Sequence, residues 1–169
     1  MTTTPPDQEL WDSFVEAKRE LHRRQADFYQ QADDKQAVLR AALAPEAGAW
    51  QQGAAFDYLK AFHHDVIPLL PELFHWAVKS ERWIGPAREV VARIPRDQRM
   101  PLLEPLFMDQ LAAAEDDDYP NLASLAASCE AWTLLERLVQ QAENHPDPDV
   151  REVIEHYNRT YGPMWQQKA

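Results

Sequence analysis

The sequence predicts an all-α protein, built as a short stack of helical hairpins with a cap of further helices at its N-terminus. Three observations lead to this prediction: a composition that favours helices, a seven-residue pattern that recurs about every 33 residues, and a four-position apolar pattern that follows each copy. A single hairpin cannot cover its own apolar stripes, so repetition at this period is typical of stacked units that share one continuous core.

The composition favours helices because Ala, Leu, Glu, Gln and Arg dominate and only four glycines occur. With 169 residues, 45% of them apolar, the chain is long enough to bury a core of its own, and we expect one domain over residues 1–169. Within it, residues 1–64 should form the N-terminal helices and residues 65–162 about three hairpins.

Three helices are expected before the repeats. Between Asp7, a suitable N-cap, and Gln31, apolar residues recur close to helical spacing. They are Leu10, Trp11, Phe14, Val15, Leu21, Phe28 and Tyr29. A shorter helix should run from Asp33 to Pro45, and another from Trp50 to His63.

The recurring pattern reads PLLPELF at 68–74, PLLEPLF at 101–107 and TLLERLV at 133–139. Each copy places its apolar residues on one side of a helix, which predicts a buried stripe in three equivalent helices. The stripes are Leu69, Leu70, Leu73, Phe74, Ala77 and Val78; Leu102, Leu103, Leu106, Phe107 and Leu111; and Leu134, Leu135, Leu138, Val139 and Ala142.

A proline that suits the first turn of a helix follows each copy: Pro86, Pro120 and Pro148. Asp147 is a good N-cap for the last of these helices. The helices share apolar residues at i, i+3, i+4 and i+7. These are Ala87, Val90, Val91 and Ile94; Leu122, Leu125, Ala126 and Cys129; and Val150, Val153, Ile154 and Tyr157.

The stretch His145-Pro-Asp-Pro-Asp-Val-Arg-Glu-Val153, with the paired-helix period, resembles the HEAT/armadillo class of α-helical repeats. Residues 84–91 (IGPAREVV) are a looser version, and residues 119–125 (YPNLASL) lack the arginine. The resemblance covers roughly residues 65–162 and implies a right-handed HEAT-like α-solenoid. The tetratricopeptide and ankyrin patterns are absent. In size, charge and architecture, the chain also resembles small acidic bacterial immunity proteins, which bind and neutralise a toxin of the same cell.

The net charge of −11 is concentrated between Glu104 and Glu155, where thirteen acidic residues face only two arginines. This balance argues against binding to a nucleic-acid backbone, which requires Lys and Arg. It favours solubility and attraction to a basic protein partner.

The acidic run from Glu115 to Tyr119 falls between the two helices of the middle hairpin, and we expect the three equivalent turns to line one edge of the stack. Carboxylates beside aromatic rings form a suitable surface for a basic protein. The alternative is a solvated turn in which one Asp caps the next helix. The candidate partner-binding residues are Glu81, Trp83, Glu115, Asp116, Asp117, Asp118, Tyr119, Glu143, Asp147 and Asp149.

No catalytic, cofactor-binding or metal-binding residues are expected. Cys129 lies on a core-facing template and allows no intramolecular disulfide. Glu72 and His75 have the spacing of one di-iron motif, but the second motif that such a site needs is missing. Among the tryptophans, Trp11, Trp76 and Trp132 fit apolar stripes and are expected in the core. Trp50, Trp83 and Trp165 fall in turns or near the end and are secondary interface candidates.

These observations predict a non-enzymatic protein-binding module, and within that class an immunity-type inhibitor of a basic intracellular toxin such as a nuclease. The alternative is a helical-repeat scaffold or adaptor that binds a peptide or protein subunit without inhibiting it; an enzyme ranks third. The start MTTTPPDQEL lacks the pattern of a secretion signal, and no segment has the length of apolar residues that a membrane span needs. The expected location is the cytoplasm.

Overall fold

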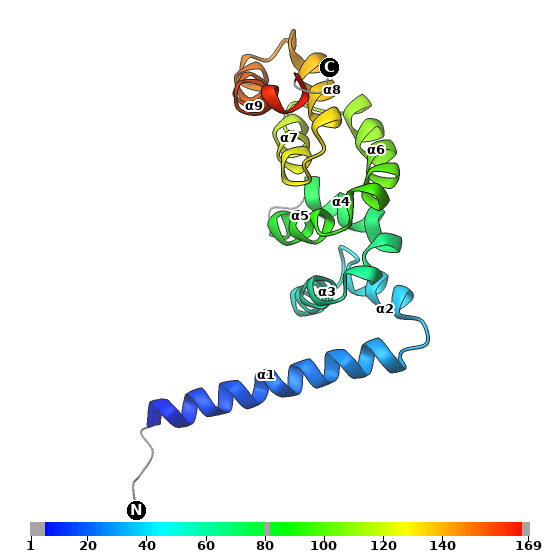
Figure 1. Ribbon diagram of the computed structural model, residues 1–169, viewed down its shortest axis with the longest axis vertical. Coiled ribbons are helices and arrows are strands. Elements are labelled where there is room, and N and C mark those ends of the chain that lie inside the picture. The colour runs from blue at the N-terminus through cyan, green and yellow to red at the C-terminus, as the bar shows by residue number, and fades with distance from the viewer. Residues whose placement is uncertain (1–5, 80–81, 167–169) are drawn as a thin grey trace, which may run out of the picture. The chain divides into compact units, whose positions relative to one another are not determined.

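The computed structural model describes residues 6–79 and 82–166 and is helical along its length (Figure 1). Helix accounts for 82% of the chain, and the described residues contain no strand. The all-α prediction is therefore confirmed. Within these residues the chain forms nine α-helices and two short 3₁₀ helices.

The chain divides into two compact units, Met1–Leu39 and Arg40–Ala169. The first unit holds α1 (Pro6–Gln31) and the beginning of α2 (Lys35–Ala42). Every residue of α1 is at least partly exposed to solvent. Its polar side is held by i,i+3 and i,i+4 ion pairs, such as the pair between Arg24 and Glu20.

The second unit holds the end of α2 and all later helices. In chain order these are α3 (Ala49–Ala61), η1 (His63–Asp65), η2 (Ile67–Leu69), α4 (Leu70–Lys79), α5 (Ile84–Ala92), α6 (Arg96–Ala112), α7 (Asp118–Ser128), α8 (Trp132–Ala142) and α9 (Pro148–Gln166). The expected first helices of the three units correspond to α4, α6 and α8, and the second helices to α5, α7 and α9.

Helices of the second unit contact one another in a regular order (Figure 1). Within each predicted hairpin the two helices touch: α4 with α5, α6 with α7, and α8 with α9. Contacts also link α3 to α5, α5 to α7 and α7 to α9, while α4 contacts α6, and α6 contacts α8. The contacts thus include two rows, α3–α5–α7–α9 and α4–α6–α8, and α7 also contacts α4 and α8.

The predicted stripes of α4 and α8 are buried in full, as are the four-position templates of α5 and α7. Of the stripe predicted in α6, only Leu103, Phe107 and Leu111 are buried, and Leu102 is exposed. The buried side of α6, which begins at Arg96, is narrower than predicted, with buried residues at intervals of four from Arg99 to Leu111. In α9, Val150 and Ile154 are buried, and the other two template positions are half-buried.

Long-range polar contacts between elements join residues 28 to 39 positions apart. In six of these pairs the separation is 31 to 33 positions, close to the period of the sequence pattern. The pairs are Arg40 with Glu72, Trp76 with the Leu43 carbonyl, Trp83 with Gln52, Arg88 with the Asn121 carbonyl, Arg93 with the Lys60 carbonyl, and Arg137 with Glu104. These contacts begin at Arg40, well before the expected start of the repeats at residue 65.

Arg99 is a buried cation that joins two helix C-termini. Its guanidinium donates to the carbonyl oxygens of Ala92 (2.6 Å) and Ile94 (2.9 Å) at the end of α5, and to that of Cys129 at the end of α7. A positive charge is favoured at these ends, where the last carbonyls lack helical partners. The sequence pattern did not predict this role.

Candidate functional site

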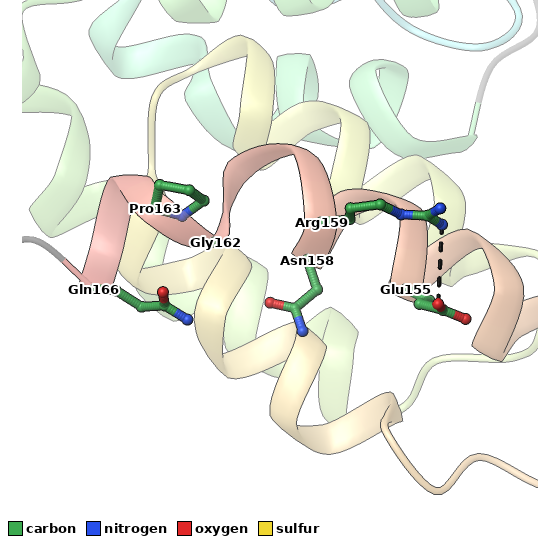
Figure 2. A pocket seen from close by; sticks show the side chains of 6 residues that line it. All are labelled: Glu155, Asn158, Arg159, Gly162, Pro163 and Gln166. Carbon is green, nitrogen blue, oxygen red and sulfur yellow. Dashed lines mark ion pairs between the residues drawn. The ribbon is translucent and has the colours of Figure 1, made fainter.

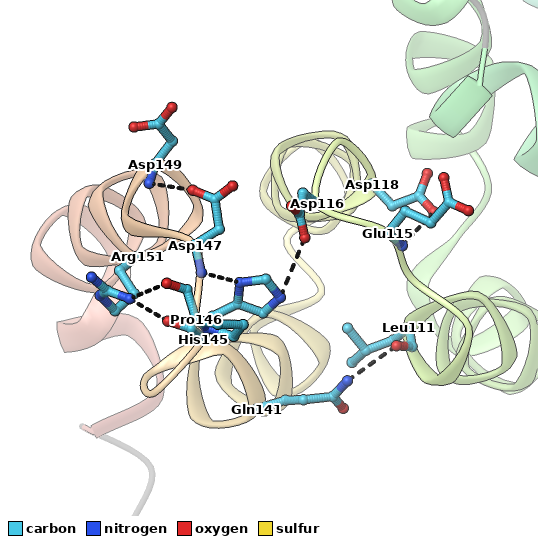
Figure 3. A network of polar contacts seen from close by, with 10 residues as sticks. All are labelled: Leu111, Glu115, Asp116, Asp118, Gln141, His145, Pro146, Asp147, Asp149 and Arg151. Atoms are coloured by element: carbon cyan, nitrogen blue, oxygen red, sulfur yellow. Dashed lines mark hydrogen bonds and ion pairs between the residues drawn. The ribbon is translucent and has the colours of Figure 1, made fainter.

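The α6–α7 turn and the α8–α9 turn lie side by side, with His145 between them (Figure 3). Its Nε2 is 3.7 Å from Oδ1 of Asp116, and its ring packs edge-on against Tyr119 with the centroids 4.9 Å apart. Next to it, the Gln141 side chain donates to the carbonyl of Leu111 over 3.1 Å. The two turns that the sequence placed at one edge are therefore neighbours.

The His145 ring is oriented by a main-chain hydrogen bond. The Asp147 N–H donates to Nδ1 of His145 over 3.2 Å, so Nδ1 acts as the acceptor. In the neutral ring the proton must then sit on Nε2, the nitrogen that faces Asp116. His145 thus connects the two turns through both of its ring nitrogens.

Asp147 caps α9, as the sequence predicted. Its Oδ1 accepts the N–H of Asp149 over 2.7 Å, directly before the helix that Pro148 opens. This hydrogen bond holds the pKa of the Asp147 carboxyl below its usual value, because it stabilises the ionised form. Arg151 further fixes the turn by donating to the Pro146 carbonyl over 2.9 Å.

Asp118 was predicted to lie on the partner-binding surface, but it is buried, with 5% of its area exposed. Its carboxylate forms an ion pair with Lys79 and accepts hydrogen bonds from the Gln110 side chain (3.0 Å) and from the Glu115 N–H (3.2 Å). Burial alone would raise its pKa, but these donors outweigh burial and lower the pKa below its usual value. Asp118 therefore holds α4, α6 and α7 together.

Tyr119 and Trp83 were also predicted on the partner-binding surface, but both are largely covered by other parts of the fold. Tyr119 is buried beneath His145. Trp83 is half-buried: its Nε1 donates to Gln52 over 2.8 Å, and its ring stacks on Phe56 with centroids 5.3 Å apart. Both aromatic side chains are used inside the fold. Glu81, another predicted residue, lies outside the described residues.

The remaining predicted carboxylates form a surface that we call the acidic rim. It consists of Glu115, Asp116 and Asp117 from the α6–α7 turn, with Glu143, Asp147 and Asp149 from the α8–α9 turn. All are exposed except Asp147, which is half-buried. The rim thus consists of six acidic side chains. The buried Asp118 and Leu111 and the half-buried His145 belong to the same region (Figure 3), and the buried Tyr119 packs against His145.

Two hollows lie on α9. One, of about 490 Å³, is lined by Glu155, Asn158, Arg159, Gly162, Pro163 and Gln166 (Figure 2). Gly162 has no side chain there, and a Cβ would come within 3.2 Å of Asn158. The second hollow, of about 320 Å³, is lined by Asp149, Glu152, Val153 and His156 and adjoins the acidic rim through Asp149.

In the described part of the chain, no group of three or more His, Cys, Asp and Glu side chains is placed to hold a metal ion. Glu72 pairs with Arg40 instead of joining His75 in a ligand set. Cys129 is buried, and burial raises the pKa of its thiol to about 11. A thiol with this pKa is a poor nucleophile at neutral pH.

None of the three tryptophans expected in the core is fully buried. Trp76 and Trp132 are half-buried; the first donates to the Leu43 carbonyl, and the second stacks on Tyr161. Trp11 was expected in the core but is exposed on α1. Trp50 is almost fully exposed at the start of α3, and Trp165 is half-buried.

Sequence reasoning missed Lys79, His145 and Arg88, which support the site. Arg88 donates to Ser124 (2.7 Å) and to the Asn121 carbonyl (3.0 Å), and so ties α5 to α7. Burial lowers its pKa from the ordinary value. The one available signal was its place in the IGPAREVV stretch, where a charged residue stands between apolar template positions.

Comparison with protein-family models, curated proteins and solved structures gives no significant match. Among the described residues, none of the helices combines the length and apolar character that crossing a membrane requires.

Proposed function

We propose that the helices of the second unit form a short right-handed stack of HEAT-like hairpins, and that this stack serves as a protein-binding module. Two observations support this arrangement: the two rows of helix contacts, and the polar contacts between residues 31 to 33 positions apart. A stack of this kind places equivalent interhelical turns on one edge, where they can act as one surface.

Within that class, we propose that the protein is an immunity-type inhibitor that neutralises a basic intracellular toxin, a nuclease with a positively charged substrate groove. The acidic rim is the observation that carries this proposal. Its exposed carboxylates come from two different turns that contact each other through Asp116 and His145. A surface of this sign matches a groove that normally receives phosphates.

The mechanism would be occlusion. Rim carboxylates would pair with the Arg and Lys side chains of the groove and exclude the nucleic acid. Charge attraction between the rim and the groove would mainly raise the association rate. Apolar contacts beside the paired charges would slow dissociation.

The experiment is a co-expression test with the product of the gene that neighbours this one, since immunity proteins are encoded beside their toxins. Growth is measured with and without the chain, and binding is measured by calorimetry. The test variant changes Glu115, Asp116 and Asp117 to Lys. Asp118 is left intact, because its buried carboxylate holds three helices together and its loss would confuse folding with binding.

The matched control reverses three exposed carboxylates outside the rim, through Glu46→Lys, Asp57→Lys and Asp97→Lys. We expect the rim variant to lose rescue and binding and the control to retain both, with equal helical circular dichroism spectra. If the rim variant still rescues, the acidic rim is not the inhibitory surface. If the chain binds but never inhibits, the adaptor alternative replaces the inhibitor.

A further inference from the structure

Helix α1 has an apolar stripe that its own unit leaves open. Four large apolar side chains on this 26-residue helix are exposed by about half or more: Leu10 (71%), Trp11 (58%), Phe14 (56%) and Leu21 (49%). Trp11 and Phe14 touch each other, with ring centroids 5.6 Å apart. Apolar side chains that cluster in this way on an exposed helix mark an interaction surface.

The stripe has the spacing of a two-stranded coiled coil. Counting Phe14 as position a, the eight a and d positions of α1 are Asp7, Leu10, Phe14, Ala17, Leu21, Arg24, Phe28 and Gln31. Five of the eight are apolar, and they run from Leu10 to Phe28. A strict a/d repeat is narrower than the stripe of an ordinary core helix and is typical of a helix that pairs with another helix.

We propose that α1 pairs with α1 of a second copy of this chain, in antiparallel orientation. The stripe is self-complementary about its middle, as a two-fold interface requires. With residue 19 at the centre, Leu10 faces Phe28 of the other copy, and the small Ala17 faces Leu21. Both contacts occur twice, so each bulky side chain meets a complementary position.

Arg24 decides the orientation. In a parallel pair the two Arg24 side chains would face each other at the same d position, and like charges at that position destabilise the pair. In the antiparallel pair Arg24 faces Phe14, so its stem covers the ring and its guanidinium can rest on the aromatic face. Lys18 flanks the centre of the stripe in both copies and can reach water there.

The area of the stripe is sufficient for a weak dimer. Covering Leu10, Trp11, Phe14 and Leu21 in both copies would bury about 950 Å² of side-chain surface, judged from the usual size of these residues. A specific interface needs roughly 1,000 Å² in total, and Ala17 and the side-chain stems beside the stripe supply the remainder. The expected dissociation constant therefore lies in the micromolar range.

Sedimentation equilibrium of the full chain from about 1 to 100 µM tests the proposal, since an interface of this size should dissociate within that range. We expect a monomer–dimer equilibrium, and Phe14→Glu with Leu21→Glu should raise the dissociation constant at least tenfold. The matched control, Gln8→Glu with Gln30→Glu, adds the same charge to exposed positions off the stripe and should change it less than threefold. Circular dichroism checks that both variants stay helical.

Orientation is measured with a spin label on Gln8→Cys. In the antiparallel pair residue 8 lies level with residue 30 of the other copy, so the two labels are about 33 Å apart along the axis at 1.5 Å per residue. A parallel pair would bring them within about 20 Å, because paired helix axes lie 8–10 Å apart. A chain that stays monomeric at the highest concentration, a dimer that the stripe variant leaves intact, or a short label distance would each overturn the proposal.

Discussion

Removing the Asp118 carboxylate tests whether this acidic residue stabilises the fold or only contributes to the protein surface. In Asp118→Ala, the Gln110 side chain and the Glu115 N–H each lose an acceptor in a site where only 5% of the residue is exposed. A hydrogen bond to a charged group contributes about 1.5–3 kcal/mol, and a buried donor without a partner costs about 1–3 kcal/mol.

Lys79 adds less to this loss, because its side chain is 40% exposed and its ammonium group can be hydrated again. Pairs of this kind contribute less than about 1 kcal/mol. Since these effects overlap, we expect Asp118→Ala to lower the free energy of unfolding by about 2–4 kcal/mol. Asp118→Asn keeps one acceptor oxygen and should lose about half as much.

Urea denaturation followed by circular dichroism measures this change as a lower midpoint with an unchanged slope. The control is Asp117→Ala, one residue away on the exposed side, which should stay within about 0.5 kcal/mol of wild type. Equal losses for the two variants would refute the structural role of Asp118.

The pH dependence gives an independent check. The folded state lowers the pKa of Asp118, so the folded protein binds this proton less readily than the unfolded chain does. The stabilisation is therefore fully present above the unfolded pKa of about 3.9 and is lost as the pH falls through the lower folded pKa. The gap between wild type and Asp118→Asn should be constant from neutral pH to about pH 4 and should shrink at more acidic pH.

Three further changes test the helix ends and the buried thiol. Arg99→Met leaves the carbonyls of Ala92, Ile94 and Cys129 without their donor and should cost about 3 kcal/mol or more in urea denaturation, with Arg99→Lys costing less. Glu130 has a φ of 49° just after α7, so Glu130→Gly should stabilise by about 0.5–1 kcal/mol and Glu130→Val should destabilise. Cys129 should react with a thiol reagent at pH 8 at least about 100-fold more slowly in the folded protein than in urea, and equal rates would contradict its burial.

Periodicity predicted the helices and most of their buried faces, because spacing along a helix determines which side chains share a side. The stripes of α4 and α8 and the templates of α5 and α7 are buried as expected. Leu102 is exposed because burial also depends on how neighbouring helices pack against a helix. In α6 the buried residues follow one another at intervals of four, and Leu102 lies beside them. No local pattern records that difference.

In the acidic run, the sequence did not indicate which aspartate is buried. Asp116, Asp117 and Asp118 are chemically identical neighbours, yet only Asp118 is buried. Its place is set by Lys79, which lies 39 positions earlier and reaches it from the end of α4. Arg99 was missed for the same reason: its acceptors are carbonyl groups at two helix ends, and carbonyl groups leave no mark in the sequence.

The division between buried and exposed acids bears directly on what the rim can do. Asp118 and Asp147 use their carboxylates to join helices and to cap α9, so they are already stabilised by partners within the fold. The five exposed rim carboxylates are those of Glu115, Asp116, Asp117, Glu143 and Asp149. The fold uses none of them in the way that it uses the carboxylate of Asp118. Under the proposed function, a basic partner would pair with these exposed carboxylates. That proposal therefore depends on the five exposed acids and not on Asp118 or Asp147, whose carboxylates already have partners within the fold.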